Sequence, residues 1–193
     1  MAVARKVANP PKHGDGGRDG GGRDFWFIEP MPRGLIDSPL DFIFAEHHRQ
    51  REAALILSML ADGEFNAHGV ESLVDFLERD FALHVADEEL VLFPMLKACC
   101  EPEDDVERII NRLVGEHKED EASCERAVSI LRRRLSGFEM TIEDKRQLRK
   151  FSDHIRQHLA LENGVLLPIA RVRLQDDVLQ AVSDSLKERR ARL

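Results

Sequence analysis

Residues 84–94 read HVADEELVLFP, and residues 158–168 read HLALENGVLLP. Both segments place a glutamate four residues after the histidine, a leucine eight residues after it and a proline ten residues after it. A lone His-x-x-x-Glu is common on helix surfaces, whereas agreement at four fixed positions is specific. The two segments therefore indicate an internal repeat, and this repeat decides the predicted fold.

Each copy of the repeat is preceded along the chain by a Glu-His dipeptide, first Glu46-His47 and then Glu116-His117. The two dipeptides are 70 residues apart, close to the 74 residues that separate the two copies. The chain is therefore predicted to consist of two helical hairpins of similar design. Each hairpin contributes one histidine from its first helix and a His/Glu pair from its second helix.

The segments around these motifs carry helix signals and no strand-like alternation. Ser38-Pro39 is a typical helix start, Gly63 a typical stop, and Thr141-x-x-Asp144 a capping box with aspartate in place of glutamate. The predicted helices cover residues 38–63, 69–99, 102–137, 141–166 and 176–190. The fold class is therefore predicted to be all-α: an up-down-up-down four-helix bundle with a short C-terminal helix. Pro94 and Pro168 are predicted to end or kink the second and fourth helices.

Three regions follow from composition: a tail at 1–34, a bundle at 35–174 and an amphipathic C-terminal helix at 175–193. The tail holds seven of the twelve glycines and is predicted to be disordered. Within it, the apolar cluster at 25–28 either docks on the core or binds a protein partner, and docking is the simpler interpretation. The C-terminal helix is the other candidate partner surface. Its basic residues suit a helix C-terminus and need no partner.

The 193-residue chain has a net charge of −8, which disfavours nucleic-acid binding through a basic surface. No apolar run reaches the roughly 18 residues needed to span a membrane, and the N-terminus lacks the apolar stretch of a secretory signal. Three cysteines in irregular positions do not form a disulfide framework and indicate a reducing compartment. The predicted location is the cytoplasm.

Positions four residues apart share one helical face, so His84 and Glu88 lie with the apolar residues that face the core. His158 and Glu162 follow the same rule. Two buried carboxylates would cost several kcal/mol each unless they are neutralised, and a metal cluster neutralises them. Carboxylates can bridge two cations, and imidazole together with carboxylate suits iron or manganese better than calcium.

A simpler interpretation exists for each residue taken singly. A lone histidine on an apolar stripe is usually a hydrogen-bonded core residue, and a lone His/Glu pair is usually a surface pair. These interpretations do not account for three features together: the repeat, the position of its His and Glu residues on the core-facing side of the helix, and the matched Glu-His dipeptides. We therefore favour the metal site.

These motifs resemble those of the hemerythrin-like, HHE cation-binding domain, and the resemblance covers about residues 38–170. The segment at 84–94 is the most specific match. The resemblance implies a four-helix bundle that holds two non-haem iron ions in an Fe–O–Fe type centre, with manganese as the alternative metal. Carried over to this chain, Glu88 and Glu162 bridge the metals, His117 and His158 bind one of them, and His47 and His84 bind the other.

One position departs from the oxygen-carrying members of that family, which place a second histidine one turn after the first on the third helix. Here Glu121 occupies that position and is predicted to be a seventh ligand. A carboxylate ligand favours the ferric state, which weakens the interpretation as a reversible oxygen carrier. If Glu121 binds, the iron of His117 is closed and the iron of His47 keeps an open position. His154 is predicted to support the site or to pack at its boundary, and His48 to be solvated.

The resemblance leaves three functions open. The first is a protein that binds or senses O2, NO or peroxide, or handles iron. The second is a di-iron peroxidase or oxidase, and the third is a metal-free helical interaction protein. We favour binding or sensing over a classical enzyme.

Overall fold

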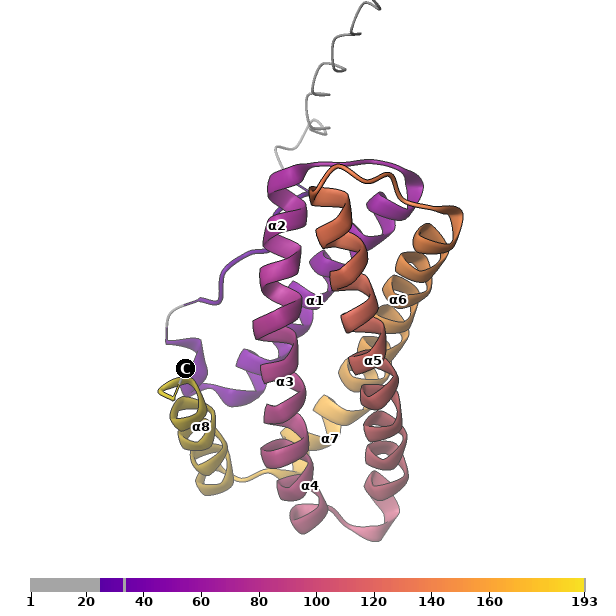
Figure 1. The fold of residues 1–193 in the computed structure, drawn as a ribbon. Helices are drawn as coiled ribbons and strands as arrows, with labels where there is room; N and C mark the ends of the chain where they lie inside the picture. The colour runs from indigo at the N-terminus through magenta and orange to yellow at the C-terminus, as the bar shows by residue number, and fades with distance from the viewer. Residues whose placement is uncertain (1–24, 33, 193) are drawn as a thin grey trace, which may run out of the picture.

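The computed structural model describes residues 25–32 and 34–192, which contain helices and no strand (Figure 1). The α-helices are α1 (Pro39–Asp62), α2 (Ala67–Asp75), α3 (Ala82–Asp87), α4 (Phe93–Cys99), α5 (Val106–Leu135), α6 (Ile142–Leu161), α7 (Leu167–Arg173) and α8 (Asp176–Arg190). Three π-helical segments, η2 (Phe76–Phe81), η3 (Glu88–Leu92) and η5 (Glu162–Leu166), join some of them into longer stretches, and the 3-10 turns are η1 (Leu35–Asp37) and η4 (Pro102–Asp104). The all-helical class is confirmed for this part of the chain.

The long helical stretches pack side by side (Figure 1). Helix α1 contacts α6, α6 contacts α5, α5 contacts α2, and α2 contacts α1. The up-down-up-down order inferred from the sequence stays a prediction. The core has two main apolar clusters, one around Leu57 and Leu131 and the other around Ile43 and Leu113. Along α1 and α5 the predicted ligand histidines fall between these clusters, so a polar layer separates two apolar ones.

Pro94 and Pro168 do not end their helical stretches, because α4 and α7 continue beyond them, so that part of the prediction is wrong. Each follows a π-helical segment that begins at a repeat glutamate, Glu88 in η3 and Glu162 in η5. The amide before each proline donates to the carbonyl of that glutamate, five residues earlier: Phe93 to Glu88 and Leu167 to Glu162. The wider turn accommodates a residue that has no N–H to donate. The Glu-x5-Pro spacing of the repeat thus corresponds to a backbone feature common at functional sites.

The predicted helix boundaries are mostly confirmed. Gly63 ends α1 with φ 96°, and the Thr141–Asp144 capping box begins α6. The C-terminal helix has the bounds expected from its amphipathic pattern. The third long helix begins later than predicted, at Val106, because Asp105 adopts a left-handed conformation (φ 49°) after the 3-10 turn.

The segment 25–28, the apolar exception within the predicted tail, follows the simpler of its two interpretations and docks on the core. Trp26 and Ile28 are buried in the apolar cluster around Leu57, while Phe27 is 47% exposed. A Cβ built on Gly69 of α2 would lie 2.8 Å from the Trp26 ring, so a glycine is required for this close approach. Docking is therefore the observed arrangement for Trp26 and Ile28. Residues 1–24 and 33 of the predicted tail lie outside the described residues.

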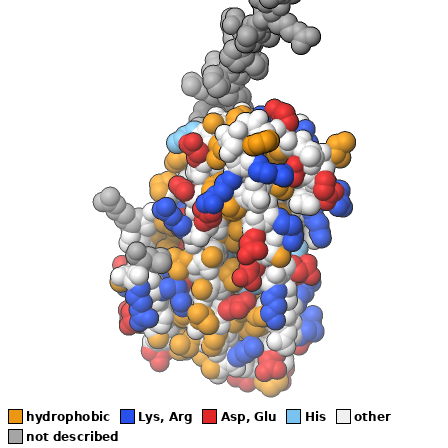
Figure 2. Space-filling view, in the orientation of Figure 1, with side chains coloured by type: hydrophobic (Ala, Val, Ile, Leu, Met, Phe, Trp, Pro, Cys, Tyr) orange, Lys and Arg blue, Asp and Glu red, His pale blue; other side chains and the backbone are white. Residues whose placement is uncertain are grey.

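Acidic and basic side chains are interspersed over the face shown in Figure 2. Within the described part of the chain, no helix is both long enough and apolar enough to cross a membrane.

Candidate metal centre

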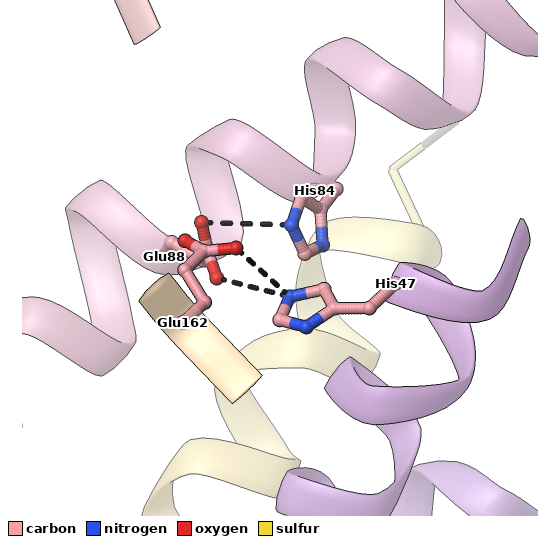
Figure 3. Close-up of side chains that lie close together, drawn as sticks. All are labelled: His47, His84, Glu88 and Glu162. Atoms are coloured by element: carbon pink, nitrogen blue, oxygen red, sulfur yellow. Dashed lines mark ion pairs between the residues drawn. The ribbon is translucent and has the colours of Figure 1, made fainter. Parts of the chain in front are cut away.

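Six of the seven predicted ligands converge in the polar layer. They come from different elements: His47 from α1, His84 from α3, Glu88 from η3, His117 from α5, His158 from α6 and Glu162 from η5. Each of these residues is at most 4% exposed. Their ligand atoms form two groups, within each of which all atoms lie within 4.8 Å of one another. The two groups share Glu88 and Glu162, and the first is completed by His47 and His84 (Figure 3).

The second group is completed by His117 and His158. Every histidine of the two groups directs Nε2 toward a shared carboxylate. In the first group His47 Nε2 lies 3.5 Å from Glu88 and 3.3 Å from Glu162, and His84 Nε2 lies 3.5 Å from Glu88. In the second group the distances are 3.4 Å from His117 Nε2 to Glu88 and 3.1 Å from His158 Nε2 to Glu162.

The other ring nitrogen of each histidine, Nδ1, lies within hydrogen-bond distance of a side-chain oxygen. The four pairs are His47 with Asn163 at 2.9 Å, His84 with Glu46 at 3.0 Å, His117 with Glu89 at 2.9 Å and His158 with Glu116 at 2.9 Å. Because a carboxylate only accepts hydrogen bonds, Nδ1 carries the proton in at least three of the rings. The Nε2 lone pairs are then free to bind a metal, an arrangement typical of metal-ligating histidines.

These supporting contacts obey the internal repeat. The glutamate before the first histidine of each hairpin contacts Nδ1 of the histidine on the following helix. Glu46 contacts His84 in this way, and Glu116 contacts His158. The residue after each shared glutamate contacts Nδ1 of the first histidine of the opposite hairpin. That residue is Glu89 in one copy and Asn163 in the other, so the supporting groups of the two halves differ by one carboxylate.

Burial and charge oppose each other at the centre. Burial alone would raise the pKa of Glu88, but the facing imidazoles of His84, His117 and His47 hold it well below its ordinary 4.5. Burial alone would lower the pKa of His84, but Glu88 and Glu46 outweigh it and raise that pKa to about 9. The carboxylates of Glu162 and Glu88 likewise overcome burial and raise the pKa of His158 to about 10. The layer therefore favours positive charge between its carboxylates.

The polar atoms without hydrogen bonds show whether metal ions fit this layer. Among the buried ones are Nε2 of His47 and His84 and all four carboxylate oxygens of Glu88 and Glu162. In addition, Nε2 of His117 lies 3.2 Å from Nε2 of His158, although Nδ1 of both rings already faces a carboxylate. Two imidazole lone pairs at that distance need a proton or a metal ion between or beside them. The donor set of four imidazoles and two shared carboxylates fits two cations.

Comparison with known proteins agrees with this chemistry. The hemerythrin HHE cation-binding domain matches residues 38–170, a span that contains all six converging residues. The chain belongs to the hemerythrin HHE family. A protein of Haemophilus influenzae, described only as an uncharacterized protein, is 26% identical over 171 residues that cover 84% of this chain and 96% of the relative. The family and the buried His/Glu groups together support metal binding, with iron as the typical metal of this domain.

Glu121 is not brought together with the other six predicted ligands of this hemerythrin domain. Its side chain is exposed and lies outside both groups of candidate ligand atoms. The buried acid of that helical turn is Asp120, whose Oδ1 lies 3.2 Å from His154 Nε2. The facing carboxylate of Asp120 raises the pKa of His154 despite partial burial. His154 thus pairs with Asp120 and belongs to neither group of candidate ligands, in line with the boundary role expected for it.

Two neighbouring histidines behave differently on α1. His47 is fully buried in the layer, whereas the His48 side chain is 42% exposed and pairs with Glu52 at 3.4 Å.

The described cysteines are free and half-buried; burial raises the pKa of Cys124 to about 12, which disfavours a reactive thiolate.

Sequence reasoning missed the residues that support the histidines. Glu46, Glu116 and Glu89 stand within the motifs, but no function was assigned to them. The signal was the recurrence of an acid directly before or after a predicted ligand.

The expectation that the C-terminal basic residues need no partner is wrong for Arg189 and Arg190, both of which contact buried acids.

Proposed function

We propose that this hemerythrin HHE protein holds a non-haem di-iron centre and binds or senses a small ligand such as O2, NO or peroxide, or handles iron. The observation that carries the proposal is the convergence of four imidazole Nε2 atoms on two buried, otherwise unpaired carboxylates. A metal-free helical protein has no reason to bury these groups together, because each unpaired polar group costs free energy. Instead, each of the four histidines has Nδ1 within hydrogen-bond distance of a side-chain oxygen and directs Nε2 toward the shared carboxylates, which is the arrangement that a metal-binding histidine needs.

In this proposal His47 and His84 hold one metal, His117 and His158 hold the other, and Glu88 and Glu162 bridge them. Each metal then has two histidines and two shared carboxylates as protein ligands. Bound iron supplies ligand positions and redox chemistry that protein side chains lack. Since Glu121 lies outside the groups, the expectation that it closes one iron loses its support, and both metals keep room for a small ligand.

A pocket gives solvent-side access to one half of the centre. It has a volume of about 550 Å³ and lies between the η2–α3 stretch and α5. His117 and Glu89 form part of its wall, with apolar side chains that include Phe81 and Val85, and Glu121 and Glu125 also line it. The carboxylates of this lining, which include Glu78, outnumber its one ammonium group, Lys118, so the pocket favours an uncharged ligand over an anion. We propose that small neutral ligands approach the metal of His117 through this pocket.

Protein expressed with ample iron is expected to contain about two iron atoms per chain, because the donor set is too large for one octahedral ion. Elemental analysis of the purified protein, combined with absorption spectra of aerobic and anaerobic samples, measures this. A reproducible iron content of zero, with unchanged helical circular dichroism, would contradict the proposal and favour the interaction protein. Repeated turnover of peroxide with a reductant would assign the centre to a peroxidase instead of a sensor.

Filling the pocket is expected to slow the approach of a neutral ligand. Ala82 lines the pocket and is itself exposed, so Ala82→Trp adds bulk there without disturbing the core. The rate of NO binding to the reduced iron protein, followed by stopped-flow absorbance, should fall several-fold. Ala160→Trp, at an exposed position of α6 outside the pocket lining, is the matched control. Equal rates in the two variants would show that ligands enter elsewhere.

In keeping with the free cysteines, we propose that the protein acts in the cytoplasm.

A further inference from the structure

Helix α8 lies outside the residues matched by the family, yet its last turn reaches the supporting contacts of the metal layer. Arg190 donates to Glu46 Oε1 at 2.9 Å and forms an ion pair with Asp87 Oδ2 at 2.7 Å. Arg189 donates to the other oxygen of Asp87 at 2.7 Å. Helix α8 packs against α1, η1 and η3, and η3 begins directly after Asp87, the last residue of α3 (Figure 1).

Glu46 links this helix to a candidate ligand. One oxygen of its buried carboxylate receives the Arg190 hydrogen bond, and the other lies 3.0 Å from Nδ1 of His84. The opposite nitrogen of the same ring faces Glu88. A continuous chain of contacts thus runs from Arg190 through Glu46 to His84. Groups in the position of Glu46 set the orientation and basicity of a metal-binding imidazole.

Asp87 gives the same arginines a second anchor. It is fully buried and directly precedes Glu88, the shared carboxylate. Its charge is compensated by Arg189 and Arg190, the two ends of its carboxylate each facing one guanidinium. A buried carboxylate that loses its cation becomes an unpaired charge beside the metal layer.

The guanidinium of Arg190 is held in place by its surroundings. It stacks on the ring of Phe42, with 4.5 Å between Cζ and the ring centre. Val182 and Leu186 of α8 pack against Phe42 and Val91, and Ser183 donates to the carbonyl of Ile36 at 2.8 Å. The helix therefore docks on the bundle through its apolar face and presents Arg190 in a fixed position.

Among the described residues, the other half of the centre receives no such arginine from a distant element. Glu116, the repeat counterpart of Glu46, is paired with Arg112, one turn away on the same helix and largely exposed. Leu161 occupies the position that corresponds to Asp87. The repeat thus makes the two half-sites alike in their ligands, while α8 makes them different in what supports those ligands.

We propose that Arg190 is a positioning residue for His84, and that α8 is thereby a functional part of one half of the metal centre. This inference rests on the proposed di-metal function. Because Arg190 acts through Glu46, its loss weakens the metal of His47 and His84 and leaves the metal of His117 and His158 in place.

The test uses the full-length iron protein and measures how fast a ferrous chelator removes each iron from the reduced form. In Arg190→Ala, one of the two irons should leave at least about tenfold faster than in the wild type, while the other leaves at the wild-type rate. Arg192→Ala is the matched control, because Arg192 follows α8 by two residues, is exposed and forms its ion pair with Glu188. It should release both irons as the wild type does.

A double variant separates positioning from general loosening of the fold. In a Glu46→Gln background, Arg190→Ala should raise the release rate by a smaller factor than it does in the wild type, because its contact with Glu46 is already weakened and only its contact with Asp87 remains to be lost. Equal release from Arg190→Ala and the wild type, with two irons bound in both, would overturn this inference alone. Additive effects in the double variant, or faster release of both irons, would also overturn it. A wild type that binds no metal would instead overturn the proposed function.

Arg190→Lys keeps a charge but lacks the planar fork that reaches Glu46 and Asp87 together. It should release the labile iron at a rate between those of the wild type and Arg190→Ala. If Arg190→Ala fails to fold, the comparison of Arg190→Lys with the wild type carries the test. A rate identical to the wild type would then count against the proposal.

Discussion

Glu88→Gln should reduce the iron content from about two atoms per chain to nearly none. Glu88 contributes an oxygen to both groups of candidate ligand atoms, so its loss removes a ligand from each metal at once. It is fully buried, and glutamine fills the same volume without the negative charge. The four imidazoles would then face a layer with half of its anionic charge, which disfavours two cations. Elemental analysis and the near-ultraviolet absorption of the iron protein measure the effect.

Three controls make this result specific. Glu162→Gln should behave as Glu88→Gln does, because the two glutamates occupy equivalent positions in the repeat. His48→Ala should retain both irons, since this exposed histidine lies outside the layer, whereas His47→Ala should not. Glu121→Ala should also retain both irons, because the exposed Glu121 side chain lies outside both groups of candidate ligand atoms. Loss of iron in Glu121→Ala would restore its predicted ligand role, and full iron content in Glu88→Gln would contradict the bridging arrangement.

The sequence contained enough information for the elements and for the central residues. Helix caps are local signals, and the capping box at Thr141 and the stop at Gly63 therefore predicted their helix ends correctly. The repeat carried the central residues, because four residues make slightly more than one helical turn and hold His84 and Glu88 on one face. The structure brings this pair together with the corresponding pair at His158.

What could not be predicted depends on contacts between distant elements. Asp120 and Glu121 lie three and four residues after His117, and both positions flank the same face of the helix. Which of them turns inward depends on the neighbouring helix, where His154 offers a partner to Asp120. Arg190 and Glu46 are 144 residues apart, and no local pattern signals their contact. The three π-helical segments could not be predicted either, because the sequence predictions rest on a regular period of 3.6 residues.

The metal-free protein should lose stability as the pH rises from about 6.5 to about 10. The pKa of His84 is raised from 6.5 to about 9 in the fold, and that of His158 to about 10, by facing carboxylates that outweigh burial. The folded state therefore binds more protons than the unfolded state above pH 6.5. The stability that these histidines contribute is fully present below pH 6.5 and is lost through their folded pKa values. For His84 alone this loss is on the order of 3 kcal/mol.

The acid side follows the opposite rule. The pKa of Glu88 lies well below its ordinary 4.5 because of the facing imidazoles, so the stability it contributes is present above pH 4.5 and is lost as the pH falls further. Urea unfolding of the metal-free protein at a series of pH values measures both limbs. His84→Gln should flatten the alkaline limb, whereas His68→Gln, which changes an exposed residue outside both groups of candidate ligands, should leave it unchanged.

Iron should reverse the alkaline behaviour, and this reversal connects the pH dependence to the proposed function. A metal replaces the protons on Nε2 of His84 and His158, so binding releases protons and strengthens as the pH rises through the range in which the metal-free protein weakens. The stabilisation by iron, measured as the difference in urea midpoint between loaded and metal-free protein, should therefore grow from pH 6.5 to pH 9. If both forms instead lost stability in parallel over this range, the protons on these histidines would not be exchanging for metal, and the layer would be a structural charge network.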